Sequence, residues 1–456
     1  MPPALPFEIW AHIASYLSSI ELGRLFSINK ALYEIYMDSR YKTLQLRRPN
    51  NDTVSKLRMM RDTASVADRV QDLEICYLIH YPLWKAESTR SWWLGNRLRH
   101  LLRFFSKEPN SLTPKSLASV QRLLLRAVNN MHGLRSVFFH LHPADGSVER
   151  YLDISRQVWL LICSRVNSLS IRAWAKHAYL LRPTFSSVYG IKHLFISLRG
   201  IYPAGEAHGL ADLINTASQS LQSLRLEMSF ISPSDPVRRI FTSLHGLCRL
   251  RRVDLSFYDA VGDEAVTFLN AHGESIDELK LSVCGTAGGA IFNIAAVRLP
   301  YLRKLSVAWN PFNWVDGSNI QFQHIWADAD FSTLDHLEIT SPFMDANDIS
   351  IFCNVFERLG SNRMQHLQLP SLTVNTEILD LIWQTFPDLR TLVFIIPTIS
   401  SESLISETAH REYPWEIDGV EITPPGQELG MPFYLHPSSY QSMRIAAKGT
   451  PSARSF

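Results

Sequence analysis

Few residues of this chain have the types and spacing that could do chemistry. His336 and His366 occupy the same position in successive copies of a repeated hexapeptide, and adjacent parallel strands would place them about 5 Å apart. Two imidazoles suit a transition metal, but no third ligand is evident in the sequence, so we predict no metal site. The glycine-rich stretch 285–290 could cradle a phosphate, yet a turn between repeats explains it more simply.

The sequence lacks the motifs of the common enzyme classes. We find no GxSxG elbow, P-loop, HExxH or GxGxxG. The five cysteines are scattered and form no CxxC pair, which favours a reducing compartment, cytosol or nucleus. We therefore predict no catalytic residue and no cofactor. An enzyme of another kind would be recognised by a deep polar pocket with convergent titratable groups.

The composition excludes some classes of partner. The 456 residues carry a net charge of +2, and 19% are charged, so we expect no concentrated basic face and no nucleic-acid partner. The sequence contains no stretch of about 18 apolar residues, so we expect no membrane span. The N-terminus does not resemble a signal peptide. With 46% hydrophobic residues, the chain can bury a large core.

A hexapeptide of the form apolar-x-x-apolar-x-apolar recurs along most of the chain. Consecutive copies start 25–32 residues apart, except for one step of 64 that leaves room for an unrecognised repeat or an insertion. Such a period is typical of solenoids. The copies start at Tyr41, Val70, Leu134, Val166, Ile191, Leu221, Leu250, Ile276, Leu302, Leu334, Met364 and Leu389.

The segments between the hexapeptides have helical periodicity, for example 211–224, 236–247 and 348–359. A strand, a turn and an amphipathic helix make the leucine-rich-repeat unit. The polar Asn/Cys position that usually follows the hexapeptide is filled only by Cys284 and Asn310, so the repeats are irregular. We expect an α/β fold in which a curved parallel sheet is covered by outer helices.

Alternation along each strand assigns side chains to the two faces of this sheet. The second and third apolar residues of each hexapeptide face the core, and the residues between and beside them face the concave side. Charges of both signs alternate there, which we interpret as a surface for a partner protein; a solvated face without a partner is the alternative. The residues predicted to bind the partner are Phe138, Phe195, Arg225, Arg252, Asp254, Lys280, Glu338 and His366.

Residues 5–46 are expected to form short helices followed by a strand. Ile9, Trp10, Ile13 and Leu17 form an apolar stripe, and Ser19 is a suitable N-cap for a second helix. About 40 residues is small for an independent core, so the helices should bury apolar surface elsewhere. They could cap the repeats or dock into a groove of another protein.

The residues Leu5-Pro6-x-Glu8-Ile9-Trp10, Tyr16-Leu17, Glu21-Leu22, Asn29-Lys30 and Tyr41-x-x-Leu44-x-Leu46 resemble an F-box of the fungal type. Tyr33 stands where the third helix of this family often has a Trp. The resemblance implies docking to the Skp adaptor, and through it to a cullin. Carried over by position, the Skp contacts would be Leu5, Pro6, Ile9, Ile13, Leu17, Leu22 and Leu25.

The chain is thus expected to divide into a docking module (1–46), first repeats with a basic, Trp-rich insertion (47–133), a solenoid (134–399) and an irregular, Pro-rich C-terminal cap or tail (400–456). F-box proteins with leucine-rich repeats form a known family, which this order of domains resembles. The resemblance implies a non-catalytic substrate-recognition subunit of a Skp–cullin–F-box ubiquitin ligase. A protein-binding scaffold outside ubiquitin ligases is the alternative.

Overall fold

The structure is a computed structural model, and it describes residues 5–47, 50–76, 114–141, 148–200, 208–230, 235–258, 262–285, 296–311, 332–341, 344–358, 363–371, 375–395, 419–423 and 443–445. The chain forms two compact units, 1–221 and 222–456. Residues 77–113 of the Trp-rich insertion predicted at 77–115 lie outside the described residues, as does most of the tail. We describe each unit by itself.

Unit 1 contains five parallel strands that pair in the order of the sequence. They are β1 (Thr43–Leu46), β2 (Asp72–Cys76), β3 (Ser136–Leu141), β4 (Ser168–Trp174) and β5 (His193–Arg199). Because β2 pairs directly with β3, the long step in the hexapeptide spacing is an insertion and not an unrecognised repeat.

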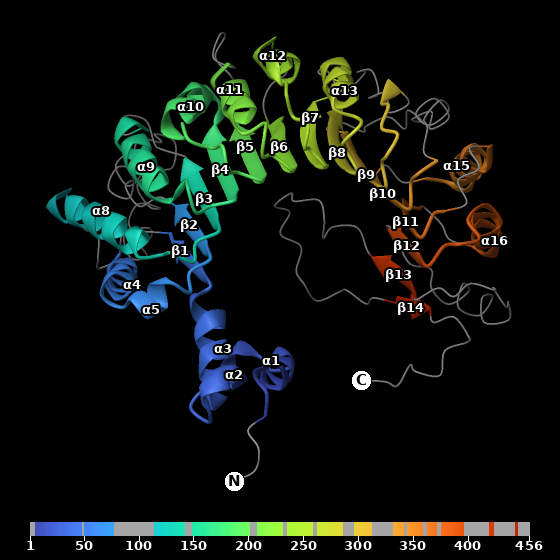
Figure 1. Cartoon of the computed structure of the whole chain (residues 1–456). Coiled ribbons are helices and arrows are strands. Elements are labelled where there is room, and N and C mark those ends of the chain that lie inside the picture. Colours follow the sequence, from blue (N-terminus) through green and yellow to red (C-terminus); the bar gives the residue numbers. More distant parts are fainter. Residues whose placement is uncertain are drawn as a thin grey trace, which may run out of the picture. The chain divides into compact units, whose positions relative to one another are not determined.

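The connecting helices of unit 1 cover one face of its sheet (Figure 1). The buried Phe139 of β3 packs against Phe185, with ring centroids 5.2 Å apart, and Phe185 meets Trp159 edge to face at 5.6 Å. These contacts join strand and helix layers into one core. The helices are α4 (Asn51–Asp62), α5 (Ala64–Ala67), α8 (Pro114–Asn129), α9 (Val148–Ile162), the 3₁₀ helix η2 (Ala175–Leu180), α10 (Leu181–Thr184) and α11 (His208–Thr216).

Three further helices precede β1: α1 (Phe7–Ser15), α2 (Ser19–Leu25) and α3 (Lys30–Tyr41). We call them the N-terminal module. The last helix leads almost directly into β1, and Arg69, which follows α5, donates hydrogen bonds to Glu34 and Asp38 of α3. The expected strand that ends the module is therefore also the first strand of the repeat sheet.

Unit 2 repeats the arrangement with seven parallel strands in sequence order. They are β6 (Ser223–Phe230), β7 (Arg252–Tyr258), β8 (Glu278–Gly285), β9 (Lys304–Pro311), β10 (His336–Ser341), β11 (His366–Pro370) and β12 (Thr391–Ile395). The helices, again on one face (Figure 1), are α12 (Asp235–Ser243), α13 (Gly262–Ala271), α15 (Ala346–Arg358) and α16 (Thr376–Thr385).

Backbone hydrogen bonds connect each repeat of unit 2 to the next. The carbonyl of Gln222 accepts from the N–H groups of both Arg251 and Arg252, and the carbonyl of Arg251 accepts from Asp277 and Glu278 in the same way. The pattern continues through Arg303, Asp335 and Gln365. These backbone hydrogen bonds connect successive repeats at the start of each strand. They do so although the polar Asn/Cys residue that usually follows the hexapeptide is mostly missing.

Two short strands continue the sheet of unit 2 into the tail. β13 (Gly419–Thr423) pairs in parallel with β12, and β14 (Met443–Ile445) pairs antiparallel with β13. The prediction that the Pro-rich tail contains no regular element is therefore wrong at these two segments. Neither contains a proline, so every residue can contribute an N–H to the ladder.

Burial alternates along the strands as predicted. β3 and β4 show alternating half-buried and buried residues, with the hexapeptide residues pointing toward the helices. We call the opposite face, in each unit, the open face of the sheet. The leucine-rich-repeat-like α/β architecture is thereby confirmed within each unit. None of the described helices has the length and apolar character needed to cross a membrane.

Candidate protein-binding surfaces

Side-chain caps set the helix boundaries of the N-terminal module. The hydroxyl of Ser18 accepts from the N–H of Glu21 at 3.3 Å, and the Glu21 carboxylate accepts from the N–H of Ser18 at 2.8 Å. This capping box makes Ser18 the N-cap of α2, one residue before the predicted Ser19. Asn29 caps α3 by accepting from the N–H of Leu32 at 2.8 Å.

The module has a small core of its own. Ala14, Leu22 and Leu32 are its buried residues, one from each helix. Around them pack the partly buried Trp10, Leu17, Leu25, Ile35 and Tyr36. Three buried side chains are few for an independent fold, so contacts with the rest of unit 1, such as those of Arg69, contribute to its stability.

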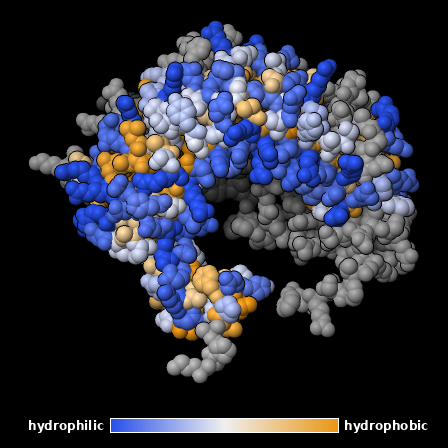
Figure 2. Space-filling model, in the orientation of Figure 1, coloured by the Kyte–Doolittle hydropathy of each residue, from blue (hydrophilic) through white to orange (hydrophobic). Residues whose placement is uncertain are grey.

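One side of α1 presents apolar residues to solvent. Ile9, Ile13 and Tyr16 follow a spacing of four and then three residues and are 45%, 39% and 76% exposed, whereas Trp10 and Ala14 face the core. Leu5 and Phe7, just before and at the start of the helix, are each 50% exposed. Figure 2 shows hydrophobic residues gathered on the surface of this module. We call Leu5, Ile9, Ile13 and Tyr16 the α1 apolar surface.

The structure divides the predicted Skp contacts into two groups. Leu5, Pro6, Ile9 and Ile13 are exposed. Leu17 and Leu25 are half-buried beside the core, and Leu22 is only 5% exposed within it. Leu22 therefore supports the surface from inside, because its position in α2 points toward α1 and α3. Sequence reasoning missed Phe7 and Tyr16, although the helical spacing from Ile9 predicts the exposure of Tyr16.

The open face of unit 1 brings the predicted Phe138 and Phe195 together, with ring centroids 6.4 Å apart. The imidazole of His140 lies 4.1 Å from the Phe138 ring, and the guanidinium of Arg172 lies 5.6 Å from its centroid. Phe138 of β3 and Phe195 of β5 are both in register with Ser170 of β4, which lies between them. Such an aromatic and cationic surface is common at protein interfaces.

The open face of unit 2 carries cross-strand ion pairs. Arg225 contacts Asp254 at 3.2 Å and Glu227 at 2.6 Å. Arg252 contacts Glu278 at 3.0 Å, and Lys304 approaches the same carboxylate at 3.7 Å. Burial raises the pKa of Asp254, while the nearby Arg225 lowers it. Charges predicted to meet a partner are thus paired within the sheet, and Lys280 is exposed beside them.

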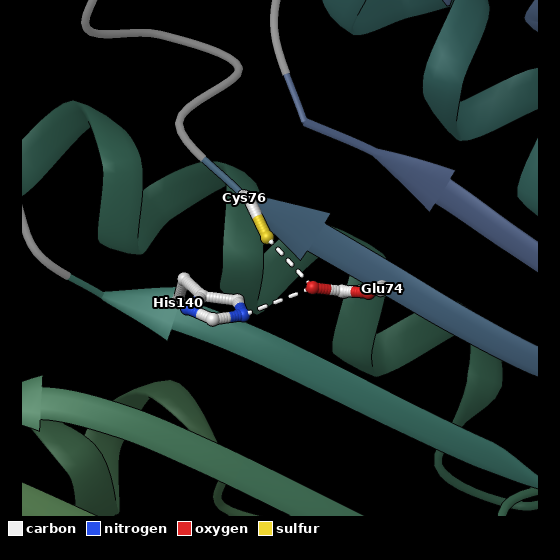
Figure 3. Close-up of side chains that lie close together, drawn as sticks. All are labelled: Glu74, Cys76 and His140. Carbon is white, nitrogen blue, oxygen red and sulfur yellow. Dashed lines mark hydrogen bonds and ion pairs between the residues drawn. The ribbon is translucent and has the colours of Figure 1, made fainter. Parts of the chain in front are cut away.

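Titratable side chains converge on the open face of unit 1, as Figure 3 shows. The Glu74 carboxylate lies 3.2 Å from both the Cys76 thiol and Nε2 of His140. Burial and the hydrogen bond to Glu74 raise the pKa of Cys76, so the thiol is protonated and donates to the carboxylate. Burial, followed by the charge of Arg172, lowers the pKa of His140.

A second group lies on the open face of unit 2. His336 pairs in register with His366, as the hexapeptide position predicts. Glu338, two residues along β10, brings its carboxylate within 2.8 Å of Nε2 of His336. The expectation that no third potential ligand lies near the two histidines is therefore wrong. Side chains two residues apart on a strand share a face, a signal that the sequence already contained.

A pocket of about 1110 Å³ lies at the edge of unit 2 where the strands begin. Its wall includes the second hexapeptide residues Asp277, Arg303, Asp335, Gln365 and Arg390. Arg303 donates from Nε and Nη2 to the Asp335 carboxylate, at 3.0 and 2.7 Å. Tyr301, Arg363 and Asp388 also line this pocket.

Similarity to known proteins is weak in both sequence and fold. No protein-family model matches the sequence, and no curated protein matches it. A chain of the crystal structure of the Rad7 and Elc1 complex in yeast is similar at a TM-score of 0.41 and 13% sequence identity, covering 87% of this chain and 88% of that one. A likeness of this size does not decide what the protein binds.

Proposed function

We propose that this chain is a substrate-recognition subunit of a Skp–cullin–F-box ubiquitin ligase. The N-terminal module would dock on the Skp adaptor, and the open sheet faces would hold a target protein. The observation that carries the proposal is the α1 apolar surface, which lies on a module whose sequence resembles an F-box.

The exposure of the α1 apolar surface supports a docking role. Tyr16 is 76% exposed, and Ile9 and Ile13, one turn apart, are 45% and 39% exposed, with Leu5 at 50% just before the helix. Clustered apolar residues on a short helix gain free energy by entering a hydrophobic groove, at about 25 cal/mol per Å² of surface buried. Single exposed apolar residues are ordinary, but a contiguous set on one helix side is typical of an interface.

In this proposal the chain is non-catalytic and acts by proximity. Holding a target beside a conjugating enzyme raises the local concentration of the target's lysines at the transfer site. The aromatic surface of unit 1 around Phe138 and the charged strands of unit 2 offer different recognition chemistry to that target. We place the assembly in the cytosol or nucleus, where such ligases act.

The test is co-purification of the tagged full chain with the host's Skp adaptor and cullin. We expect the wild type to recover both, and an Ile9→Ser, Ile13→Ser variant to bind Skp roughly thirtyfold more weakly, corresponding to about 2 kcal/mol of lost apolar burial. Tyr189→Ser is the matched control, because Tyr189 is 73% exposed but lies outside the module. Circular dichroism checks that all three proteins fold.

Two outcomes would overturn the proposal. If neither the wild type nor the control recovers Skp, the chain acts outside these ligases, as a protein-binding scaffold. If the Ile9→Ser, Ile13→Ser variant recovers Skp as well as the wild type, docking does not use the α1 apolar surface.

A further inference from the structure

Three ligand-type side chains meet on the open face of unit 2. His336 and Glu338 lie on the same face of β10, two residues apart, and the register places His366 of β11 beside His336. One nitrogen or oxygen atom of each residue lies within 4.8 Å of the others. We call these three residues the β10–β11 triad.

The triad contains an unsatisfied polar atom. Nε2 of His366 is buried and has no hydrogen-bond partner, whereas Nε2 of His336 contacts Glu338 Oε1 at 2.8 Å. The two imidazole rings stack nearly parallel, with centroids 3.9 Å apart and planes inclined by 8°. A buried imidazole nitrogen without a partner is rare in a stable protein, and a bound ion would satisfy it.

The charge states of the triad match a divalent cation. Burial, and then the neighbouring His336, lower the pKa of His366, so this ring is neutral near pH 7. The hydrogen bond from His336 lowers the pKa of Glu338, and Ser306 also donates to this carboxylate. A neutral imidazole and an ionised carboxylate are the forms that bind metals, and Ser306 would orient the carboxylate.

The neighbouring strands supply little positive charge that would repel a cation bound at the triad. The nearest cation from β9 is Lys304, which also lowers the pKa of His366, but Lys304 approaches the Glu278 carboxylate of β8 at 3.7 Å. On the other side, β12 presents Thr391 and Val393 in register with His366 and Gln368. The triad therefore keeps one net negative charge when both histidines are neutral.

We propose that His336, Glu338 and His366 bind one zinc ion through two imidazole nitrogens and a carboxylate oxygen, with the fourth position open to water or to a side chain of a bound protein. Nitrogen donors favour zinc over magnesium and calcium, which prefer oxygen ligands. Ligands of one tetrahedral zinc lie about 3.4 Å apart, so the half-exposed rings must rotate out of their stack to converge. This inference does not depend on Skp docking.

The cluster of Glu74, Cys76 and His140 in Figure 3 meets the same distance criterion but is less suited to a cation. Burial raises the pKa of the Cys76 thiol, so zinc would have to displace its proton in order to bind there. The positive charges of Arg172 and Arg47 also act on this cluster and oppose a metal ion. It therefore provides a matched control on a comparable sheet face.

The test is a zinc titration of the chelator-stripped full chain against a chromophoric competitor at pH 7.5. We expect one equivalent to bind with a Kd on the order of 1 µM, and His336→Gln, His366→Gln to weaken binding at least about 100-fold. Cys76→Ser, His140→Gln should bind zinc like the wild type. Lowering the pH to 5.5 should release the ion, because protonated imidazoles do not coordinate.

X-ray absorption at the zinc edge of the zinc-loaded wild type identifies the types of ligand atoms without any substitution. It therefore tests the proposal even if a variant misfolds. We expect nitrogen and oxygen neighbours at about 2.0–2.2 Å with imidazole scattering, and no sulfur at about 2.3 Å. A sulfur neighbour would place the ion at a cysteine and overturn the proposal. Failure to bind one equivalent, or unchanged binding in a folded His336→Gln, His366→Gln variant, would also overturn it.

Discussion

Two half-buried histidines make the stability of this protein sensitive to acid. Burial is the main cause that lowers the pKa of both His140 and His366 in the folded chain. An unfolded histidine has a pKa of about 6.5. Below that pH the unfolded chain binds protons at these positions before the folded chain does, so acid favours unfolding.

We expect the free energy of unfolding to fall as the pH drops from about 6.5 toward the lower folded pKa values of His140 and His366. Urea titrations in the presence of a chelator, at pH 7.5 and 5.5, measure the change. A His140→Gln, His366→Gln variant should lose less stability between the two pH values than the wild type. An equal loss in both proteins would assign the acid sensitivity to other groups.

At the same scale, the sequence analysis named all three residues of the β10–β11 triad. It did not predict that Glu338 lies beside the two histidines. Glu338 and His366 were predicted on the concave face, and the pairing of His336 with His366 followed from the repeat. The alternation of side chains also puts Glu338 on the face of His336, yet its distance depends on rotamers. The proximity of Cys76 and His140 could not be predicted, because the long insertion leaves open whether β2 pairs with β3.

At the scale of elements, close backbone approach between repeats depends on particular glycines. A Cβ on Gly133, between α8 and β3, would lie 2.1 Å from the carbonyl oxygen of Asp68, which follows α5. In unit 2 a Cβ on Gly273 would lie 2.4 Å from the carbonyl oxygen of Arg298. Both glycines let the chain after a helix touch the backbone of a neighbouring repeat.

We expect Gly133→Ala to destabilise the protein by about 1–3 kcal/mol, because the new methyl group must displace a backbone carbonyl. For a protein of this size that corresponds to a decrease in Tm of several degrees. Gly190→Ala is the control, since a Cβ there meets nothing within 4 Å. Thermal unfolding followed by circular dichroism makes the comparison, and equal Tm values would show that the loop rearranges freely.

Element positions were predictable where the hexapeptide is present. The strands β1 to β12 coincide with predicted copies, and α11, α12 and α15 overlap the segments of helical periodicity. β13 and β14 were missed although Ile417-Asp-Gly-Val420-Glu-Ile422 and Tyr440-Gln-Ser-Met443-Arg-Ile445 both fit the hexapeptide pattern. The prolines around these two segments favoured an irregular tail instead. Ser18, and not the predicted Ser19, is the N-cap of α2, because Ser18 and Glu21 form the reciprocal hydrogen bonds of a capping box.

At the scale of the whole molecule, each strand pairs with the strands next to it in sequence. In repeat architectures, stability is approximately a sum of repeat and nearest-neighbour terms. A defect in one repeat should therefore weaken its neighbours more than distant repeats.

Phe257→Ala tests this expectation. Phe257 is fully buried in β7 and packs edge to face on Phe241, with ring centroids 5.9 Å apart. Truncation of a buried phenylalanine costs about 3–5 kcal/mol. Hydrogen exchange should accelerate in β7 and β8 while the amides of β2 and β3 keep their wild-type protection. A uniform increase across all these strands would indicate that the chain unfolds as one cooperative unit.

The order of strand pairing also bears on how the protein is made. Within each unit, nearly every parallel strand finds its partner in the repeat synthesised just before it, and no strand waits for a distant C-terminal segment. Short sequence separation keeps the entropy of loop closure low and speeds folding. On the ribosome, each newly emerged repeat could add to a completed edge, so that unpaired strands are exposed only briefly.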